Sequence, residues 1–177
     1  PLREAQGALP SREPQCHGGD ISTLGKCGEV ASVIRVLHVI NTLAPGGAET
    51  LVTDLCAKLP GEGVEPAVAY LFGEATLAER LVAKGVHVEA LSLGKRPSPL
   101  AFYRTLKLIR ARNIQLVHAH LAYAGIVAKT AARVRGIPVV MTRHLEFEPK
   151  AGTFAYRLDN WLTRRYADKL IAVGERV

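Results

Sequence analysis

The chain has 177 residues with a formal net charge of +7, and 48% of them are hydrophobic against 22% charged. This balance is typical of a globular domain rather than of a disordered chain, and no apolar run reaches the about 18–20 residues that a membrane-spanning helix needs. Three cysteines in no zinc-type spacing, with no secretory signal before them, favour a reducing, cytoplasmic compartment.

Residues 1–32 differ in composition from the rest of the chain. They contain prolines and several glycines but no sustained apolar period, which predicts a disordered or weakly structured leader. Because the chain begins with Pro1, our hypothesis is that this leader is upstream sequence read in frame and that the protein starts near Val33. Residues 33–177 are then one domain, truncated at its C-terminal end.

Residues 34–59 predict a buried strand, a glycine turn and an amphipathic helix. The strand is the β-branched apolar run 34–40, and Gly46 and Gly47 break the pattern after it. Leucines then recur every fourth residue, with Val52 and Cys56 beside them, and together these residues predict one apolar helix face: Leu51, Val52, Leu55, Cys56 and Leu59. The N–H groups at such a helix start favour an anionic ligand, and glycines let it approach closely. A plain tight turn is the alternative.

After this unit, strands and helices alternate along the chain. The predicted strands are residues 66–72, 86–91, 114–118, 138–142 and 169–173. The predicted helices are residues 75–84, 99–112, 122–135 and 154–167. In the helix 99–112, Ser98 is the N-cap and Pro99 the first helical residue. Short connections between such units predict a Rossmann-like, doubly wound parallel sheet with helices on both faces. In that fold class, ligands bind at the carboxyl ends of the strands.

Polar residues gather where three of these strands end. The candidates are Asn41, Thr42, Gly46 and Gly47 after the first strand, His118 and His120 after the fourth, and Thr142, Arg143 and His144 after the fifth. Arg143 is either a phosphate partner or a solvent-facing residue. His38 and His87 lie inside strands and are interpreted as structural.

His118 and His120 are two residues apart, so their side chains point the same way. A buried, hydrogen-bonded structural role is the alternative for His118, whereas His120 is expected just past the strand. A zinc site would need a further ligand, for which His144 is the only obvious candidate, and nothing fixes its distance. We therefore predict no metal site.

The segment 95–112 carries six basic residues and no acid: Lys95, Arg96, Arg104, Lys107, Arg110 and Arg112. One interpretation is a peripheral contact with an anionic membrane surface at the inner face of the cell membrane. The solvated face of an ordinary helix is the alternative. Few aromatic residues are interleaved and no nucleic-acid motif occurs, so we predict no nucleic-acid partner.

Three segments together resemble a known family: HVINTLAPGGAETLV, LVHAHLAYAGIVAKTAARVRGIPVVMTRH and ADKLIAVGERV. Over residues 34–177 the chain resembles the N-terminal domain of GT-B glycosyltransferases of the family-4 type. The resemblance implies two Rossmann-like domains facing a cleft, with a nucleotide diphosphate sugar as donor substrate and no cofactor. It implies that Gly46 and Gly47 lie near the donor diphosphate and the acceptor.

By the same resemblance, His120 is expected to hydrogen-bond the transferred sugar, and Thr142 and His144 to line the acceptor side. The family's usual serine before the last glutamate is Gly174 here. The C-terminal domain, with its paired glutamates, is missing, so we expect this fragment to be inactive alone. The parent enzyme is expected to be a retaining transferase of polysaccharide biosynthesis that acts on a lipid-linked or saccharide acceptor. The alternatives are a non-catalytic α/β ligand-binding or regulatory module and half of a nucleotide-sugar epimerase.

Overall fold

The computed structural model describes residues 33–92, 99–144 and 153–173. All of them lie within the unit Ala31–Val177. The predicted leader, the basic residues Lys95 and Arg96, the N-cap Ser98 and Gly174 also lie outside the described residues.

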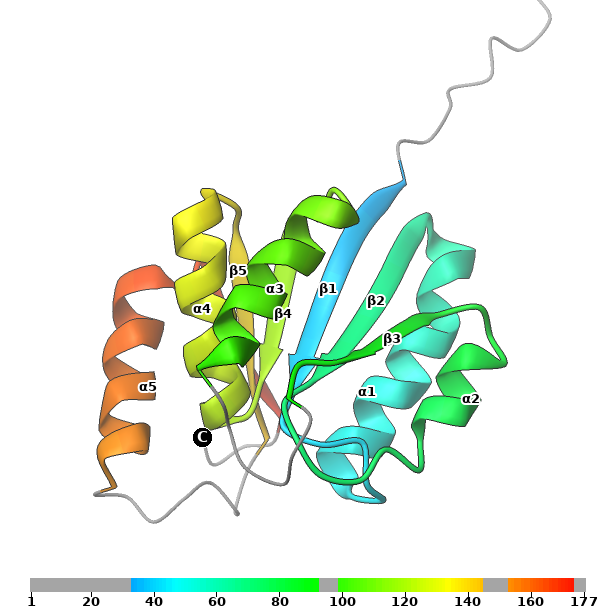
Figure 1. Cartoon of the computed structure of the whole chain (residues 1–177), viewed down its shortest axis with the longest axis horizontal. Coiled ribbons are helices and arrows are strands. Elements are labelled where there is room, and N and C mark those ends of the chain that lie inside the picture. Colours follow the sequence, from blue (N-terminus) through cyan, green and yellow to red (C-terminus); the bar gives the residue numbers. More distant parts are fainter. Residues whose placement is uncertain (1–32, 93–98, 145–152, 174–177) are drawn as a thin grey trace, which may run out of the picture. The chain divides into compact units, whose positions relative to one another are not determined.

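Six strands form one parallel sheet, which confirms the predicted fold class (Figure 1). They are β1 (Ile34–Ile40), β2 (Val64–Tyr70), β3 (His87–Ala90), β4 (Leu116–His120), β5 (Val139–His144) and β6 (Lys169–Val173). Their order in the sheet is β3-β2-β1-β4-β5-β6. This is the doubly wound order, in which strands are added on one side of β1 up to β3 and on its other side from β4 onwards. Folds of this kind bind ligands at the carboxyl ends of the strands beside this reversal.

Five α-helices and one 3-10 turn connect these strands within the described ranges. They are α1 (Gly47–Lys58), η2 (Leu59–Glu62), α2 (Ala78–Val82), α3 (Leu100–Ala111), α4 (Ala122–Arg135) and α5 (Phe154–Tyr166). None of the described helices is long and apolar enough to cross a membrane. The helix predicted at 75–84 is observed only over Ala78–Val82 (α2), so it is shorter than expected. Pro99 is the N-cap of α3 rather than its first helical residue.

Tertiary hydrogen bonds explain the short α2. The N–H of Leu43 donates to the carbonyl of Glu74 at 3.1 Å, and the N–H of Leu77 donates to the carbonyl of Leu43 at 2.9 Å. The carbonyl of Glu74 and the N–H of Leu77 therefore bind the loop after β1 and are unavailable to a longer helix. Local periodicity carries no information about such a contact.

The core has two layers because odd and even residues of the strands face opposite sides. Odd residues such as Leu37 and Val39 pack with α3 and α4, and even residues such as Ile40 pack with α1 and α2. In α1 the buried face is Val52, Thr53 and Cys56. The predicted apolar face is therefore confirmed at Val52 and Cys56 but wrong at Leu51, which is 39% exposed and lies about 100° around the helix from Val52.

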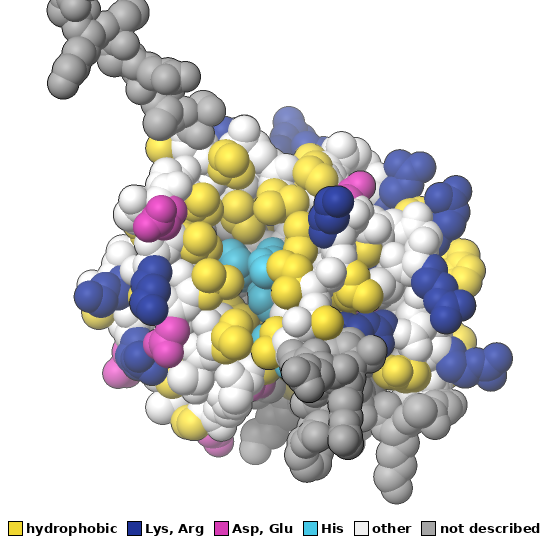
Figure 2. Space-filling view, turned by 180° about the vertical axis from the view of Figure 1, so that it is seen from behind, with side chains coloured by type: hydrophobic (Ala, Val, Ile, Leu, Met, Phe, Trp, Pro, Cys, Tyr) yellow, Lys and Arg dark blue, Asp and Glu magenta, His cyan; other side chains and the backbone are white. Residues whose placement is uncertain are grey.

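In the part of the chain that the structure describes, one half of the sheet is open on the face that carries the even residues of β1. On that face α1 and α2 pack with β2 and β3, whereas β6 is exposed along its whole length. Figure 2 shows histidine side chains at the centre of a broad hydrophobic surface. By strand register, Ile34, Ile171 and Val173 share this face, and all three are exposed.

Candidate functional site

Four histidines and one threonine share the open face of the sheet. His38 of β1 pairs in register with His118 of β4, and His120 of β4 pairs with Thr142 of β5. Residues two apart on a strand point the same way, so the side chains of His38, His118, His120, Thr142 and His144 lie on one face. We call these five residues the histidine cluster. β4 includes His120 as its last residue, so the expectation that His120 lies past the strand is wrong.

Hydrogen bonds join the histidine cluster into two connected pieces. His38 Nδ1 lies 3.2 Å from His120 Nε2, and His120 Nδ1 lies 3.2 Å from His144 Nε2. His118 Nε2 lies 2.6 Å from Thr142 Oγ1. The rings of His118 and His120 are also in contact, with centroids 4.1 Å apart. A chain of imidazoles therefore runs from the buried His38 to the half-buried His144.

Burial keeps these imidazoles neutral at pH 7. It lowers the pKa of His38 to about 3 and that of His118 to about 4, and in both cases a neighbouring histidine lowers the pKa further. The pKa of His120 is well below its usual value for the same reasons. Burial lowers the pKa of His144 as well, whereas the charge of Glu49 opposes that shift. Neutral imidazoles can accept and donate hydrogen bonds or bind a metal, but they cannot neutralise a phosphate.

The glycine turn contains an acid of its own. Gly46 is the N-cap of α1, and a Cβ there would clash with the carboxylate of Glu49, whereas a Cβ on Gly47 would meet nothing within 4 Å. Thr42 Oγ1 donates to Glu49 Oε1 at 3.1 Å. The Glu49 carboxylate therefore occupies the positive end of the helix dipole, beside the position where the sequence predicted a diphosphate.

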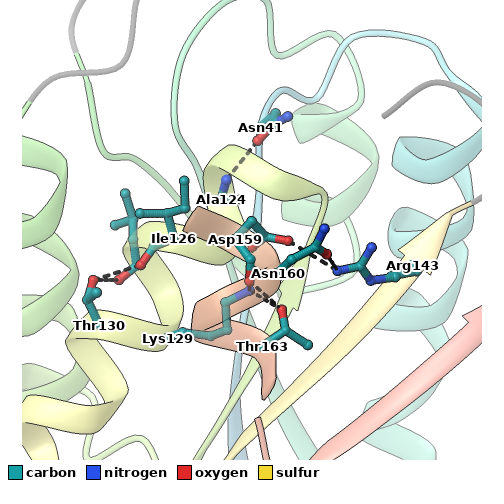
Figure 3. Close-up of polar contacts among 10 residues, drawn as sticks. Asn41, Ala124, Ile126, Lys129, Thr130, Arg143, Asp159, Asn160 and Thr163 are labelled. Atoms are coloured by element: carbon teal, nitrogen blue, oxygen red, sulfur yellow. Dashed lines mark hydrogen bonds and ion pairs between the residues drawn. The ribbon is translucent and has the colours of Figure 1, made fainter. Parts of the chain in front are cut away.

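Asn41 connects the end of β1 to the start of α4. Its Oδ1 accepts a hydrogen bond from the N–H of Ala124 at 2.9 Å (Figure 3). Leu121, just before α4, has a positive φ of 66°, which is uncommon for a residue with a side chain. The β4–α4 turn is thus held in a strained conformation next to His120, and strain of this kind gathers at functional sites.

Arg143 lies apart from the histidine cluster. It is an odd residue of β5 and contacts α5, where its guanidinium donates to Asn160 Oδ1 and lies 3.6 Å from Asp159 Oδ2 (Figure 3). Its side chain is 14% exposed, so the alternative of a solvent-facing residue is wrong. Its role as a phosphate partner stays a prediction that requires it to leave Asp159 and Asn160.

The same view shows a buried ion pair that sequence reasoning missed. Lys129 of α4 and Asp159 of α5 are paired with both side chains fully buried, and Lys129 Nζ also donates to Thr163 Oγ1 at 2.7 Å (Figure 3). A Cβ on Gly125 would lie 2.5 Å from Asp159 Oδ1. Burial raises the pKa of Asp159, and Lys129 and Arg143 oppose that rise. We call Lys129, Asp159, Thr163, Arg143 and Asn160 the charged network.

The structure brings together four of the predicted site residues, His118, His120, Thr142 and His144, and adds His38. His38 is buried, as its structural interpretation requires, but its bond to His120 makes it part of the cluster. The signal that could have identified His38 as part of the cluster is its position in the strand. When β1 and β4 are neighbours, the even residues of both strands lie on the same face of the sheet. Thr42 and Gly46 adjoin Glu49, whose charge acts on His144.

A separate cavity of about 450 Å³ lies at the start of β5, among residues that include Arg133, Pro138, Tyr166 and Asp168. None of the predicted site residues lines this cavity. The Asp168 carboxylate accepts a hydrogen bond from the N–H of Val139 there. Because parallel α/β sheets bind ligands at the carboxyl ends of their strands, we place the candidate site at the histidine cluster.

These features define a class of protein: a doubly wound α/β domain with a candidate ligand site at its topological switch point. A family model described as Glycosyltransferase Family 4 matches residues 45–177, so the chain belongs to glycosyltransferase family 4. Its fold is that of the N-terminal half of GT-B enzymes.

Individual relatives agree with this assignment. The protein named Putative glycosyltransferase EpsF from Bacillus subtilis (strain 168) is 30% identical over 108 residues, which cover 59% of this chain and 28% of EpsF. HepE of Anabaena, solved in complex with UDP, has a TM-score of 0.63 at 21% identity, covering 77% of this chain and 37% of its own. MurG of Acinetobacter baumannii gives 0.59 at 12% identity, covering 81% and 42%.

A UDP-GlcNAc 2-epimerase from Methanocaldococcus jannaschii shares the fold at a TM-score of 0.55 and 9% identity, over 78% of this chain and 39% of its own. At this identity the likeness concerns the fold alone. The family match therefore favours a glycosyltransferase domain over half of an epimerase. The chain spans about a third of the length of these relatives.

Proposed function

We propose that the parent enzyme transfers a sugar from a nucleotide diphosphate sugar to a lipid-linked or saccharide acceptor in polysaccharide biosynthesis, with retention of configuration. The present chain would be its acceptor-side domain. Membership of family 4 supports this proposal, and HepE has been solved in complex with UDP-glucose. The observation that carries it is the histidine cluster at the carboxyl ends of β4 and β5, beside the N-terminus of α1.

The chemistry proposed for this site is positioning and charge stabilisation, with no protein nucleophile. Backbone N–H groups at Gly46 and Gly47 would bind the departing diphosphate, and Asn41 and Thr42 would border it. The carboxylate of Glu49 adjoins this position, so a diphosphate can bind there only if that side chain moves away.

His120 would hydrogen-bond the transferred sugar, with His118, Thr142 and His144 around it. Both nitrogens of His120 already have imidazole partners and the residue is fully buried. A sugar hydroxyl must therefore replace His144, the half-buried outer member of the chain. Once His144 turns aside, His120 Nδ1 can bond the sugar while its Nε2 keeps His38.

A full-length enzyme provides the test. Replacing His120 with alanine should lower kcat by about a hundredfold, the loss typical for removing one preorganised hydrogen bond to a transition state. His87→Ala is the matched control, because His87 lies on β3 and bonds Glu89 and Arg112 instead. Near-normal turnover of the His120 variant would reject its role as a sugar contact.

We also propose a cytoplasmic location with peripheral attachment to the inner face of the cell membrane. The basic segment supports this less strongly than its composition suggested. Arg104 donates to the carbonyl of Leu91 at 3.3 Å and Arg112 bonds His87 Nδ1 at 2.7 Å, which leaves Lys107 and Arg110 as the exposed cations of α3. Binding to anionic liposomes that weakens with salt and falls on Lys107→Gln/Arg110→Gln would support it; salt-insensitive or absent binding counts against it.

A further inference from the structure

The cavity of about 450 Å³ at the start of β5 lies at the opposite end of that strand from Thr142 and His144. Helices α4 and α5 both end beside it, and they contribute Arg133, Arg165 and Tyr166 to its lining. None of the described residues assigned to sugar transfer lines this cavity. A ligand bound there would therefore occupy a site separate from the histidine cluster.

The two arginines of the cavity share one aromatic ring. The Cζ atoms of Arg133 and Arg165 lie 5.7 Å and 5.5 Å from the centroid of the Tyr166 ring. Cation–π attraction acts over such distances, and it involves arginine more often than lysine. Because the three residues come from two helices, the Tyr166 ring holds both guanidinium groups at one cavity.

Basic residues in the last turn of a helix can also serve only to balance the helix dipole. Four arginines have such positions: Arg133 and Arg135 in α4, and Arg164 and Arg165 in α5. Of these four, only Arg133 and Arg165 line the cavity. Within the described part of the chain, neither of their guanidinium groups has a hydrogen-bonded or ion-paired partner, so their N–H donors are available to a ligand.

One carboxylate lines the same cavity. Asp168 Oδ2 accepts a hydrogen bond from the N–H of Val139 at 2.8 Å, which fixes this side chain at the start of β5. Among the described residues, Asp168 Oδ1 has no hydrogen-bond partner and neither arginine forms an ion pair with Asp168. A bare anion would meet both attraction and repulsion here, whereas an anion that carries hydroxyl groups can donate one of them to Oδ1. The cavity therefore favours a ligand with an anionic group and a hydroxyl group.

The surface around the cavity is basic. Helix α4 contains no acidic residue, and the one acid of α5, Asp159, is fully buried beside Lys129. The exposed residues of α5 include Arg157, Trp161 and Arg164. Figure 2 shows Lys and Arg side chains along the edge of the molecule that α5 occupies, at the right of this view, with hydrophobic side chains between them. Such a surface raises the local concentration of anions.

We propose that Arg133, Arg165 and Asp168 form a binding site for a hydroxyl-bearing phosphate ester of the glycerol phosphate type. The oxygens of a phosphate group are numerous enough to accept hydrogen bonds from both guanidinium groups, whose planar donor fork fits them. A hydroxyl group of the ester would donate to Asp168 Oδ1. Glycerol phosphate occurs both as a soluble ester and in the headgroup of anionic phospholipids, and the site fits either source. The proposal does not rest on the proposed transfer reaction, because binding is measured on the present chain without any donor sugar.

The test is titration of the 177-residue chain with glycerol 3-phosphate. Trp161 is the only tryptophan of the chain, and its ring meets that of Tyr166 edge-on at 6.0 Å between centroids, so its fluorescence reports on the site. We expect a saturable change in emission, and Arg133→Gln and Arg165→Gln should each weaken binding by about tenfold or more. Arg157→Gln is the matched control, because Arg157 is exposed on the same helix but does not line the cavity, and it should bind like the unmodified chain.

A second comparison tests the hydroxyl contact. The unmodified chain should bind glycerol 3-phosphate more tightly than inorganic phosphate. Asp168→Asn replaces the accepting oxygen with an amide and should reduce this preference by about fivefold, in the range of one hydrogen bond.

Vesicles distinguish the two sources of the ester. If the site takes a lipid headgroup, vesicles of phosphatidylglycerol should shift the Trp161 emission to shorter wavelength, vesicles of phosphatidylcholine should not, and Arg133→Gln should abolish the shift. If the site takes a soluble ester, glycerol 3-phosphate should bind and the vesicles should not. Either result supports the site. Lys107→Gln/Arg110→Gln, which tests attachment through α3, should leave binding of glycerol 3-phosphate unchanged.

The proposal is overturned if neither the ester nor the vesicles bind, or if inorganic phosphate binds as tightly as the ester. It is also overturned if Arg157→Gln weakens binding as much as Arg133→Gln, since the attraction would then be diffuse. If a glutamine variant fails to fold, as judged by circular dichroism, Arg165→Lys decides. This variant keeps the charge but loses the planar fork, so it should weaken binding by about threefold or more, and unchanged binding would reject the site.

Discussion

The charged network and the histidine cluster lie on opposite faces of one sheet, and they differ in the charge of their side chains and in how far they are covered. The charged network joins opposite charges, Lys129 and Arg143 against Asp159, between α4 and α5. The histidine cluster consists of neutral side chains that are hydrogen-bonded to one another at the carboxyl ends of the strands. In the part of the chain the structure describes, it lies on an open face of the sheet. Opposite charges that pair inside the protein suit a structural role, whereas neutral side chains gathered at strand ends suit a ligand.

The largest expected effect concerns the charged network. Lys129→Met leaves Asp159 buried without its main counter-charge, so the free energy of unfolding should fall by about 3–5 kcal/mol. The double variant Lys129→Met/Asp159→Leu removes both charges of the fully buried pair and should recover part of that loss, since Arg143 then loses the charge of Asp159. Urea denaturation of the three chains measures both values. A single variant as stable as the unmodified chain would show that the pair contributes nothing, and the comparison of the two groupings would fail.

The second prediction concerns the pH dependence of stability, which the histidine cluster should dominate. His38 and His118 have folded pKa values of about 3 and 4 against about 6.5 in an unfolded chain. The unfolded state therefore binds more protons below pH 6.5, and stability should fall as the pH drops from about 6.5 towards 4. The slope is at most about 1.4 kcal/mol per pH unit for each histidine.

Denaturation at several pH values measures this slope, and His38→Gln should reduce it. The charged network acts in the opposite sense: burial raises the pKa of Asp159, so its contribution to stability decreases as the pH rises. A pH-independent stability between pH 7 and 5 would contradict the neutral, buried state of the cluster.

The third prediction compares the two glycines of the turn. Gly46→Ala places a Cβ against the Glu49 carboxylate, so it should displace that side chain and lower stability by about 1 kcal/mol, in the range of a lost helix cap. Gly47→Ala meets no atom within 4 Å and should stabilise the start of α1 by about 0.5–1 kcal/mol, because alanine favours a helix over glycine. Thermal unfolding of the two variants checks the difference in sign; equal effects would refute the close approach of Glu49.

The smallest expected effect concerns Glu49, whose charge acts from the glycine turn on the histidine cluster. The Glu49 charge raises the pKa of His144, so Glu49→Gln should lower it, as NMR titration of His144 would show. The same change should strengthen binding of inorganic diphosphate by about two- to fivefold, since one charge at a helix N-terminus is worth about 0.3–1 kcal/mol. If neither the pKa of His144 nor the affinity for diphosphate changed, the charge of Glu49 would have no influence on the histidine cluster or on anion binding at the turn.

Much of the fold could be predicted from the sequence, because apolar runs and glycine breaks are local signals. The strand at Ile34–Ile40 and the helix at Ala122–Arg135 were located at their observed bounds. Two details depended on tertiary contacts instead. The short α2 follows from the hydrogen bonds of Leu43 with Glu74 and Leu77, and the exposure of Leu51 follows from how α1 is rotated on the sheet.

The site was predicted in part, for a reason that lies in strand pairing. The sequence indicated His118, His120, Thr142 and His144 because each follows or ends an apolar run. It missed the role of His38, because only the neighbouring position of β1 and β4 shows that this residue faces His120. The buried Lys129 was equally invisible in an alanine-rich helix, although its spacing of four residues from Gly125 places both on one helix face.

The most direct test of the account measures sugar transfer and unfolding on the same full-length variants. The account predicts that His120→Ala lowers kcat by about a hundredfold and shifts the unfolding midpoint little. The double variant Lys129→Met/Asp159→Leu should keep kcat within a few-fold of the unmodified enzyme. A His120 variant that retains full turnover, or a double variant that folds but loses it, would contradict the assignment of function to the histidine cluster.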